Sequence, residues 1–193
     1  MTGLLHPNSA LLSDAFSRCK QWRPALAVAL LVFTALGGAS ERQAVPRLEG
    51  RVTDVAKILS AVDRERLGTL LARYEGETSH QIGVLVIPTL AGETIESYSL
   101  RVARAWKLGK KGLDNGILVT MAMKERAVRI ELGVGFEKYI SNATAQAIIG
   151  NAMVPAFRKG DYAGGLQAGL EELMKEGRRF VVTRGESKRA AQP

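Results

Sequence analysis

Gln81-Ile82-Gly83-Val84-Leu85-Val86-Ile87-Pro88 is the stretch that decides the fold. It is a short, mostly β-branched apolar run stopped by proline, which is typical of a strand buried on both faces. A second apolar run follows at 117–122, and residues 127–132 then alternate between apolar and charged side chains. This alternation predicts a strand with one face toward solvent. We expect the last two strands to pair as a hairpin.

Sequence patterns of amphipathic helices surround these strands. Capping residues followed by apolar residues at helical spacing predict four helices, at 61–78, at 94–107, after Ser141 (interrupted by Pro155) and after Asp161. Helices on both faces of a small mixed sheet are the simplest way to bury the apolar strands. The expected fold class is therefore α/β, a three-layer sandwich with helices on both faces of a small central mixed β-sheet.

The amino-terminal segment has the three parts of a secretory signal. Three basic residues precede the apolar run Ala25–Leu36, and the small residues Gly37-Gly38-Ala39 follow it. Roughly 15 apolar residues are few for a membrane span, so we expect cleavage after Ala39; an uncleaved membrane anchor is the alternative. Either outcome predicts an exported, periplasmic protein, and the second one attaches it to the inner membrane.

The rest of the chain divides into three parts by composition. Residues 40–50 are polar and contain proline, as a linker does, and residues 51–180 form the domain. Residues 181–193 form a basic tail; we expect a solvated basic surface, and contact with an anionic membrane surface is the alternative. The chain carries a net charge of +8, but its basic residues are not interleaved with aromatic ones in a stripe. Nucleic acid is therefore not an expected partner.

Several kinds of catalytic site lack the residues that they require. Cys19, the only cysteine, lies in the leader, which excludes disulfides and a cysteine nucleophile in the mature domain. His80 is the only histidine after the leader, so a His-dependent triad and a multi-His zinc site are excluded; we expect it at the surface or at a strand edge. Because no nucleotide-binding or nucleophile-elbow motif occurs, we expect no organic cofactor.

Acidic and amide side chains stand at loop positions throughout the domain. They are Asp54, Asp114, Asn115, Glu137, Asn142 and Asp161. Hard cations such as Ca²⁺ or Mg²⁺ take oxygen ligands of this kind, so the set permits a metal site. The alternative is purely structural, because Asp114-Asn115-Gly116 and Gly133-Val134-Gly135 also have the composition of ordinary turns.

Five blocks in order resemble the TPM domain family, from about Arg51 to Lys175. The blocks are Val52-Thr53-Asp54, Gln81-Ile82-Gly83-Val84, the run 106–116, the run 126–137 and the run 155–162. The resemblance implies an α/β sandwich outside the cytoplasm. Relatives include a thylakoid-lumen protein linked to photosystem II repair and described as an acid phosphatase with calcium near acidic loops, and bacterial exported or membrane-anchored proteins.

The resemblance also assigns roles to residues. Asp54, Asp114, Asn115 and Glu137 fall where the family has acidic and polar loop residues, which implies a metal site. The basic positions Arg126 and Arg129 match as well, and with Lys111 they are the candidate contacts for an anion or phosphate. The family often has Asp where this chain has Asn142, so one ligand charge is missing.

Two functions follow. The favoured one is an accessory module for membrane-protein complexes, with calcium stiffening its loops. The alternative is a metal-dependent acid phosphatase, in which a cation on Asp54, Asp114 and Glu137 polarises a phosphoryl oxygen and a basic residue neutralises developing charge. No residue in the sequence is identified as a nucleophile or general base, which favours the accessory module.

Overall fold

The computed structural model describes residues 42–137 and 139–190, so the export segment 1–39 lies outside the described residues. The chain divides into two units, 1–41 and 42–193, and the second contains every described residue. Its sheet has the strand order β1 (Val52–Asp54), β2 (Gln81–Ile87), β3 (Gly116–Ala122) and β4 (Ala127–Leu132). The first three strands are parallel and β4 is antiparallel to β3, which confirms the predicted mixed sheet and hairpin.

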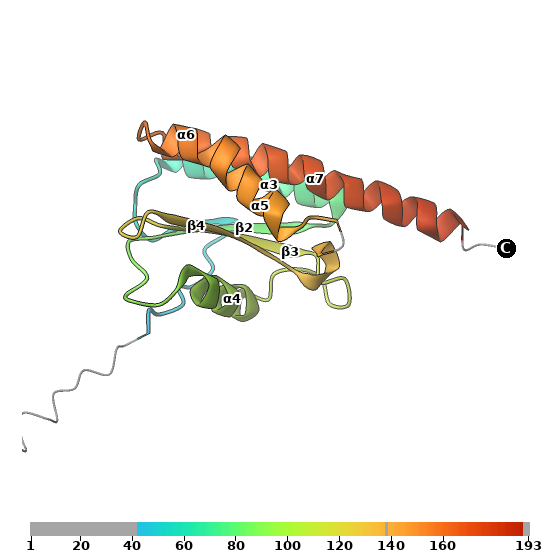
Figure 1. Ribbon diagram of the computed structural model, residues 1–193, viewed down its shortest axis with the longest axis horizontal. Helices are drawn as coiled ribbons and strands as arrows, with labels where there is room; N and C mark the ends of the chain where they lie inside the picture. The colour runs from blue at the N-terminus through green and yellow to red at the C-terminus, as the bar shows by residue number, and fades with distance from the viewer. Residues whose placement is uncertain (1–41, 138, 191–193) are drawn as a thin grey trace, which may run out of the picture. The chain divides into compact units, whose positions relative to one another are not determined.

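Helices cover both faces of this sheet. They are α3 (Ala61–Thr78), α4 (Ile95–Trp106), α5 (Asn142–Ile148), α6 (Val154–Phe157) and α7 (Tyr162–Ala190), with a 3₁₀ turn η2 (Val134–Phe136) and a π-helical segment η3 (Ile149–Met153). Figure 1 shows α3, α5, α6 and α7 on one face and α4 on the other. The predicted three-layer sandwich is confirmed.

Side-chain caps fix where the helices begin. The hydroxyl of Ser60 accepts a hydrogen bond from the backbone N–H of Asp63, and Ser141 caps α5 in the same way. Asp161 accepts from the N–H of Gly164 at the start of α7. Pro155 lies in the first turn of α6, directly after the π-helical segment, so the helical path is interrupted where the sequence predicts it.

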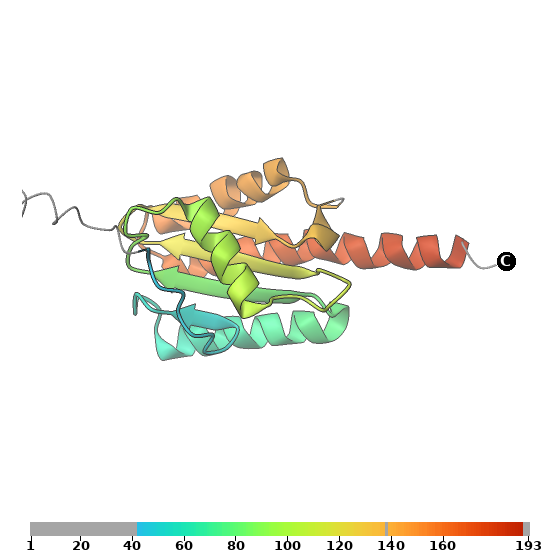
Figure 2. The same ribbon diagram turned by 90° about the horizontal axis from the view of Figure 1, so that it is seen from below.

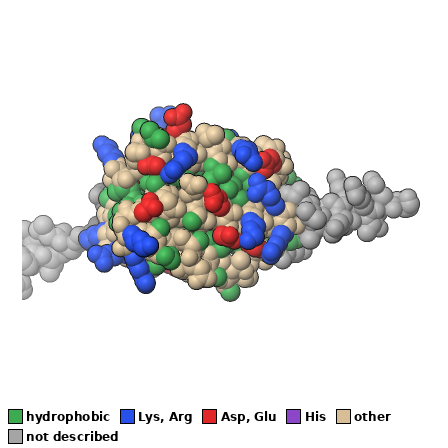
Figure 3. Space-filling model, turned by 90° about the horizontal axis from the view of Figure 1, so that it is seen from above, with side chains coloured by type: hydrophobic (Ala, Val, Ile, Leu, Met, Phe, Trp, Pro, Cys, Tyr) green, Lys and Arg blue, Asp and Glu red, His purple; other side chains and the backbone are tan. Residues whose placement is uncertain are grey.

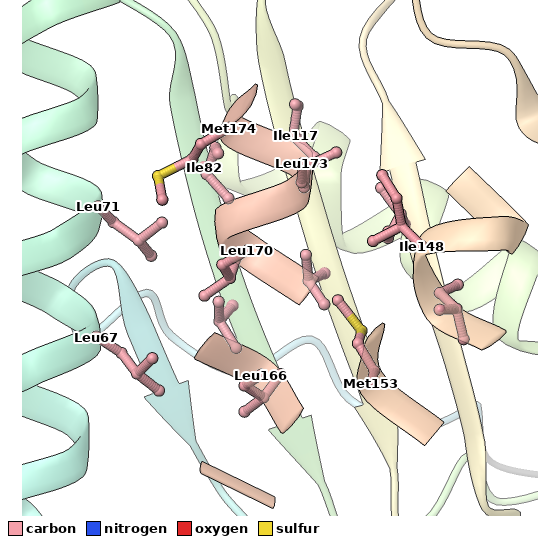
Figure 4. Close-up of a cluster of buried hydrophobic side chains, with 14 of the residues drawn as sticks. Leu67, Leu71, Ile82, Ile117, Ile148, Met153, Leu166, Leu170, Leu173 and Met174 are labelled. Atoms are coloured by element: carbon pink, nitrogen blue, oxygen red, sulfur yellow. The ribbon is translucent and has the colours of Figure 1, made fainter. Parts of the chain in front are cut away.

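Two apolar cores hold the layers together. The larger core lies between the sheet and helices α3, α5 and α7, and Figure 4 shows leucines of α3 and α7 meeting the isoleucines of β2 and β3. The smaller core lies under α4, where Leu85, Ile87 and Leu118 of the sheet meet Tyr98 and Val102. Strands β2 and β3 therefore bury both faces, as their continuous apolar sequence predicts.

Residues 43–46, in the segment predicted as a linker, lie along α4. Three side chains of α4 donate hydrogen bonds to their carbonyl oxygens: Arg101 to Gln43 at 2.6 Å, Tyr98 to Ala44 at 3.1 Å and Trp106 to Pro46 at 2.9 Å. At the other end, α7 continues to Ala190, through most of the segment predicted as a tail. Among the described residues, no helix is both long enough and apolar enough to cross a bilayer.

Charges of both signs are interspersed over the helical face that Figure 3 shows. Part of this arrangement is local pairing. Glu77 of α3, for example, accepts hydrogen bonds from Arg73 at 2.9 Å and from Arg178 of α7 at 2.6 Å. These two hydrogen bonds, the one from Arg178 above all, lower the pKa of Glu77. Exposed pairs of this kind contribute little to stability, but they neutralise part of the basic excess on this face.

Candidate functional site

The two edges of the sheet carry the candidate residues. Both edges are meant here as ends of the strands, not as outermost strands. We call the amino edge the end of the sheet where β2 and β3 begin and β4 ends, and the carboxyl edge the end where β1, β2 and β3 end and β4 begins. Figure 2 shows the two edges at opposite ends of the strands. Asp114, Asn115 and Glu137 flank β3 and β4 at the amino edge, whereas Asp54 ends β1 at the carboxyl edge.

The strand register separates these two groups widely. Asp54 pairs with Val86, and Val86 pairs with Met121, which lies six residues after Asn115. At about 3.3 Å per residue, this separation is roughly 20 Å along the sheet. One cation therefore cannot be bound by Asp54 together with the other three residues, and the expectation of one shared site is corrected by the topology.

Backbone contacts between two loops build the amino edge. The N–H of Gly133 donates to the carbonyl of Gly116 at 2.8 Å, and the N–H of Gly135 donates to the carbonyl of Asp114 at 3.1 Å. A Cβ atom on Gly133 would lie 2.1 Å from the Asp114 carbonyl oxygen. The glycines around Val134 are therefore required by close backbone packing, and their interpretation as turn residues is confirmed.

Asn115 holds the same loop from inside. Its side chain is buried, its Nδ2 donates to the carbonyl of Ser79 at 2.7 Å, and its Oδ1 accepts from the N–H of Lys110 at 2.8 Å. Both polar atoms of the amide are therefore engaged: Nδ2 joins the loop to the end of α3, and Oδ1 closes the loop on itself. In this arrangement Asn115 orders the edge and does not present a free oxygen to a cation.

Gln81 is a second residue that orders this loop, and the sequence reasoning missed it. Its Oε1 accepts from the N–H of Gly109 at 2.8 Å, and its Nε2 donates to Glu75 at 3.0 Å. The signal available in the sequence was a polar amide at the first position of an otherwise apolar strand. Such a residue has no place in the core, so its hydrogen bonds must be made at the edge.

Asp114, Glu137 and Lys111 point outward from these loops. All three are exposed, and Asp114 has a positive φ of 46°, which Asp tolerates better than most residues. Among the described residues, no group of three or more His, Cys, Asp or Glu side chains is close enough to hold a metal ion. Because calcium takes six to eight oxygens, two carboxylates leave most of its ligands to backbone oxygens and water.

Asp54 is buried in its own loop at the carboxyl edge. Its side chain is 0 % exposed, and its Oδ2 accepts a hydrogen bond from the N–H of Leu59 at 2.8 Å and lies 3.9 Å from Arg64. Its Oδ1 has no hydrogen-bond partner among the described residues. These contacts close the turn between β1 and α3.

The three candidate basic residues are also separated. Arg129, in the middle of β4, forms an ion pair with Glu131 at 2.9 Å and lies 4.0 Å from Glu96 of α4. Arg126 lies exposed in the β3–β4 turn at the carboxyl edge, and Lys111 lies at the amino edge. A single anion site made of all three residues does not exist in this fold.

His80 is buried, so the expectation of a surface position is wrong. Its Nδ1 lies 2.9 Å from the hydroxyl of Tyr74, and its ring packs edge-on against Phe136 with 4.7 Å between ring centroids. Burial raises the pKa of Tyr74 to about 12. The cluster joins α3, β2 and η2, and it thereby supports the amino edge from within the larger core.

The comparisons with known proteins agree with this architecture. The family model of the TPM domain matches residues 52–176, which is most of the described part of the chain. The chain belongs to the TPM domain family. No curated protein is significantly similar to it.

Among solved structures, the N-terminal domain of a protein from P. gingivalis is similar to this TPM domain at 30% identity, with a TM-score of 0.62, covering 67% of this chain and 83% of that one. The BA42 protein from Bizionia argentinensis has 20% identity and a TM-score of 0.58, covering 66% and 87%. The N-terminal domain of a protein from Corynebacterium glutamicum has 19% identity and a TM-score of 0.53, covering 70% and 84%. The last two similarities concern the fold alone.

Proposed function

We propose that this TPM-domain protein is an exported accessory module for membrane-protein complexes in the periplasm, and that it contacts its partner through the amino edge. The observation that carries the proposal is Val134. This apolar side chain is 67 % exposed, although its backbone is fixed on both sides by Gly133 and Gly135. Tyr139, which follows the same turn, is exposed as well, so the amino edge presents more than one isolated apolar side chain to a partner.

The surroundings of Val134 support a role in recognition. Exposed Lys111, Asp114 and Glu137 belong to the same two loops, so apolar and charged groups are displayed together, as in the core and rim of an interface. Because hydrogen bonds and close glycine contacts already order these loops, binding would require little further loss of conformational freedom.

A matched pair of substitutions tests the contact surface. Val62, in the first turn of α3, is 72 % exposed but does not belong to the amino edge, so Val62→Asp is the control for Val134→Asp. Tagged full-length chains would be recovered from the solubilised membrane fraction, and co-purifying proteins quantified. We expect Val134→Asp to lose a stoichiometric partner that the wild type and Val62→Asp retain. Equal recovery with both variants would contradict this surface.

The metal part of the proposal reduces to Asp114 and Glu137, with backbone oxygens and water completing a low-affinity calcium site. Calcium should then raise the melting temperature of the full chain, because a ligand that binds only the folded state stabilises it. The Asp114→Asn, Glu137→Gln double variant should lose this shift. The control double variant Glu171→Gln, Glu172→Gln removes the same charge from exposed positions of α7 and should keep it. The same shift in both double variants would reject the site.

The phosphatase alternative loses its structural argument, because its three proposed ligands Asp54, Asp114 and Glu137 lie at opposite edges. An assay of the full chain with a generic phosphomonoester, calcium and magnesium still separates the two functions. We expect no hydrolysis beyond that of an Asp54→Ala, Asp114→Ala variant. Clearly faster hydrolysis by the wild type would favour an enzyme instead.

A further inference from the structure

A cavity of about 620 Å³ opens at the carboxyl edge, away from the amino-edge loops. Its walls are largely apolar and come from β3, β4, α6 and the start of α7; they include Met121, Met123, Val128, Val154, Phe157 and Tyr162. Most of these side chains pack against the larger core but are only partly buried. The size and the apolar lining are those of a ligand pocket.

Two guanidinium groups line the same cavity. Arg126 comes from the β3–β4 turn and Arg158 from the end of α6; both residues are partly or fully exposed, and neither forms an ion pair with a described residue. Neighbouring carboxylates are engaged elsewhere. Glu125 accepts hydrogen bonds from the Thr89 hydroxyl and the Leu90 N–H, and Asp161 caps α7. The two arginines and the apolar walls of the cavity therefore favour a ligand in which an anionic group is attached to an apolar group.

Strand β4 is the outermost strand of the sheet, so only one of its two sides is paired with another strand. The other side decides in which direction a peptide could pair beside the cavity. The hydrogen bond from the Gly133 N–H to the Gly116 carbonyl shows which residues of β4 are hydrogen-bonded to β3. Because such pairs alternate along an antiparallel ladder, the N–H and C=O groups of Val128, Ile130 and Leu132 point away from β3. No described residue outside the sheet forms a backbone hydrogen bond with these three. Val128 and Leu132 are partly exposed, whereas Ile130 is only 3 % exposed, so the free side of β4 is covered in the middle of the strand and accessible at Val128, which lines the cavity.

A peptide that pairs antiparallel with β4 would run from Leu132 toward Ala127. Its carboxyl terminus would then lie beside Arg126, and the side chain opposite Val128 would project on the face that the cavity occupies. A parallel peptide would place its ammonium group next to the arginines instead. Charge thus selects the antiparallel direction.

We propose that the carboxyl edge binds the free carboxyl terminus of a partner protein whose last residue is apolar. The last residue of the peptide pairs with the free backbone groups of Val128 in β4, its terminal carboxylate binds Arg126 and Arg158, and its last side chain enters the cavity. Strand addition with alternate side chains in pockets is a recurrent way of recognising extended peptides. This site is separate from the amino-edge surface, so the failure of one proposal leaves the other standing.

The test uses the full chain and a fluorescent six-residue peptide that ends in Phe. We expect saturable binding of the free acid and at least about tenfold weaker binding of the C-terminal amide, because charge-assisted hydrogen bonds are lost. The Arg126→Gln, Arg158→Gln variant should bind the free acid more weakly by a similar factor and should bind the amide with unchanged affinity. The control Lys124→Gln, Lys159→Gln removes the same charge from exposed neighbours that do not line the cavity, and it should bind as wild type.

Hydrogen exchange supplies an independent readout of strand addition. Bound peptide should slow amide exchange at Val128, whose N–H points away from β3 and whose side chain lines the cavity. Equal affinity for acid and amide, the same loss in the arginine and lysine variants, or no saturation up to about 1 mM peptide would each overturn the proposal. Binding of decanoate with no binding of the peptide would also overturn it, and would identify a site for a small amphipathic acid.

Discussion

The two edges of the sheet differ in what orders them. At the amino edge, backbone meets backbone: glycines allow the loop before β3 and the turn after β4 to touch, and Asn115 and Gln81 fasten them. At the carboxyl edge, side chains from β3, β4, α6 and α7 surround a cavity. The sequence blocks that carry the family resemblance are densest at the amino edge, where they mostly serve the backbone. A recognisable motif is therefore weak evidence for chemistry at the same position.

The largest effect should come from adding one methyl group to the amino edge. Gly133 has an ordinary φ of −65°, but a Cβ atom there would lie 2.1 Å from the Asp114 carbonyl oxygen. Gly133→Ala should therefore cost at least about 3 kcal/mol in the free energy of unfolding, through backbone displacement alone. Urea denaturation would measure it.

Gly76→Ala is the matched control for this substitution. Gly76 lies in the last turns of α3, and its Cβ would meet nothing within 4 Å. Because alanine is the better helix former, this variant should be stabilised by about 0.5–1 kcal/mol. Similar losses in both variants would show that the amino edge is not tightly interlocked.

A pair of neighbours at the amino edge should give the next largest effect. Asn115→Asp removes the donor to Ser79 and buries a charge, so we expect a loss of about 2–4 kcal/mol. Asp114→Asn makes the reverse exchange at an exposed position and should change stability by less than about 0.5 kcal/mol. If calcium instead stabilised Asn115→Asp more than the wild type, Asn115 would be a ligand position and our structural assignment would fail.

Burial explains which of these features the sequence could predict. Helix α3 agrees with its predicted bounds because Ser60 and the apolar spacing act locally, and the β3–β4 hairpin follows from two adjacent runs. Asp114 and Asn115 have similar side chains and adjacent positions, yet one is exposed and the other is buried against Ser79. That difference depends on a contact across 36 residues, which no local pattern contains.

The division of the candidate site could not be predicted for a related reason. Local patterns contain no strand order, and without it the edge at which each loop lies is undetermined. Once β1, β2 and β3 are known to be parallel, Asp54 must lie at the opposite edge from the loop that precedes β3. The cavity-lining residues Phe157 and Arg158 come together with Met123 only through α6, so no spacing in the sequence marks them.

Alkaline pH should lower the free energy of unfolding through two buried tyrosines, with a smaller effect from each than from the substitutions above. Burial raises the pKa of Tyr74, near the amino edge, and of Tyr98, near the start of α4, from 10.0 to about 12. Both tyrosines then ionise first in the unfolded chain, so the stability present below pH 10 is lost as the pH rises toward 12. We expect a loss of about 2 kcal/mol for each residue.

Single phenylalanine variants would separate the two contributions. Tyr98→Phe should flatten part of the decline in urea stability between about pH 10 and pH 12. Tyr74→Phe should flatten it too, but it should also lower stability near neutral pH, because the hydroxyl contact with His80 is lost. An unchanged pH profile in both variants would show that neither tyrosine is buried as described.

A small effect on stability should also come from Arg126→Gly, the reverse of the Gly133 experiment. Arg126 has a positive φ of 50°, which costs a residue with a Cβ atom about 1–2 kcal/mol, whereas glycine adopts it freely but loses more entropy on folding. These terms nearly cancel, so stability should change by less than about 1 kcal/mol while affinity for a free peptide carboxylate falls. A larger destabilisation would mean that the Arg126 side chain holds the β3–β4 turn together. If Arg126→Gly is instead stable but no longer binds the peptide, the amino edge needs its glycines for folding, whereas the carboxyl edge keeps an arginine at a positive φ for binding.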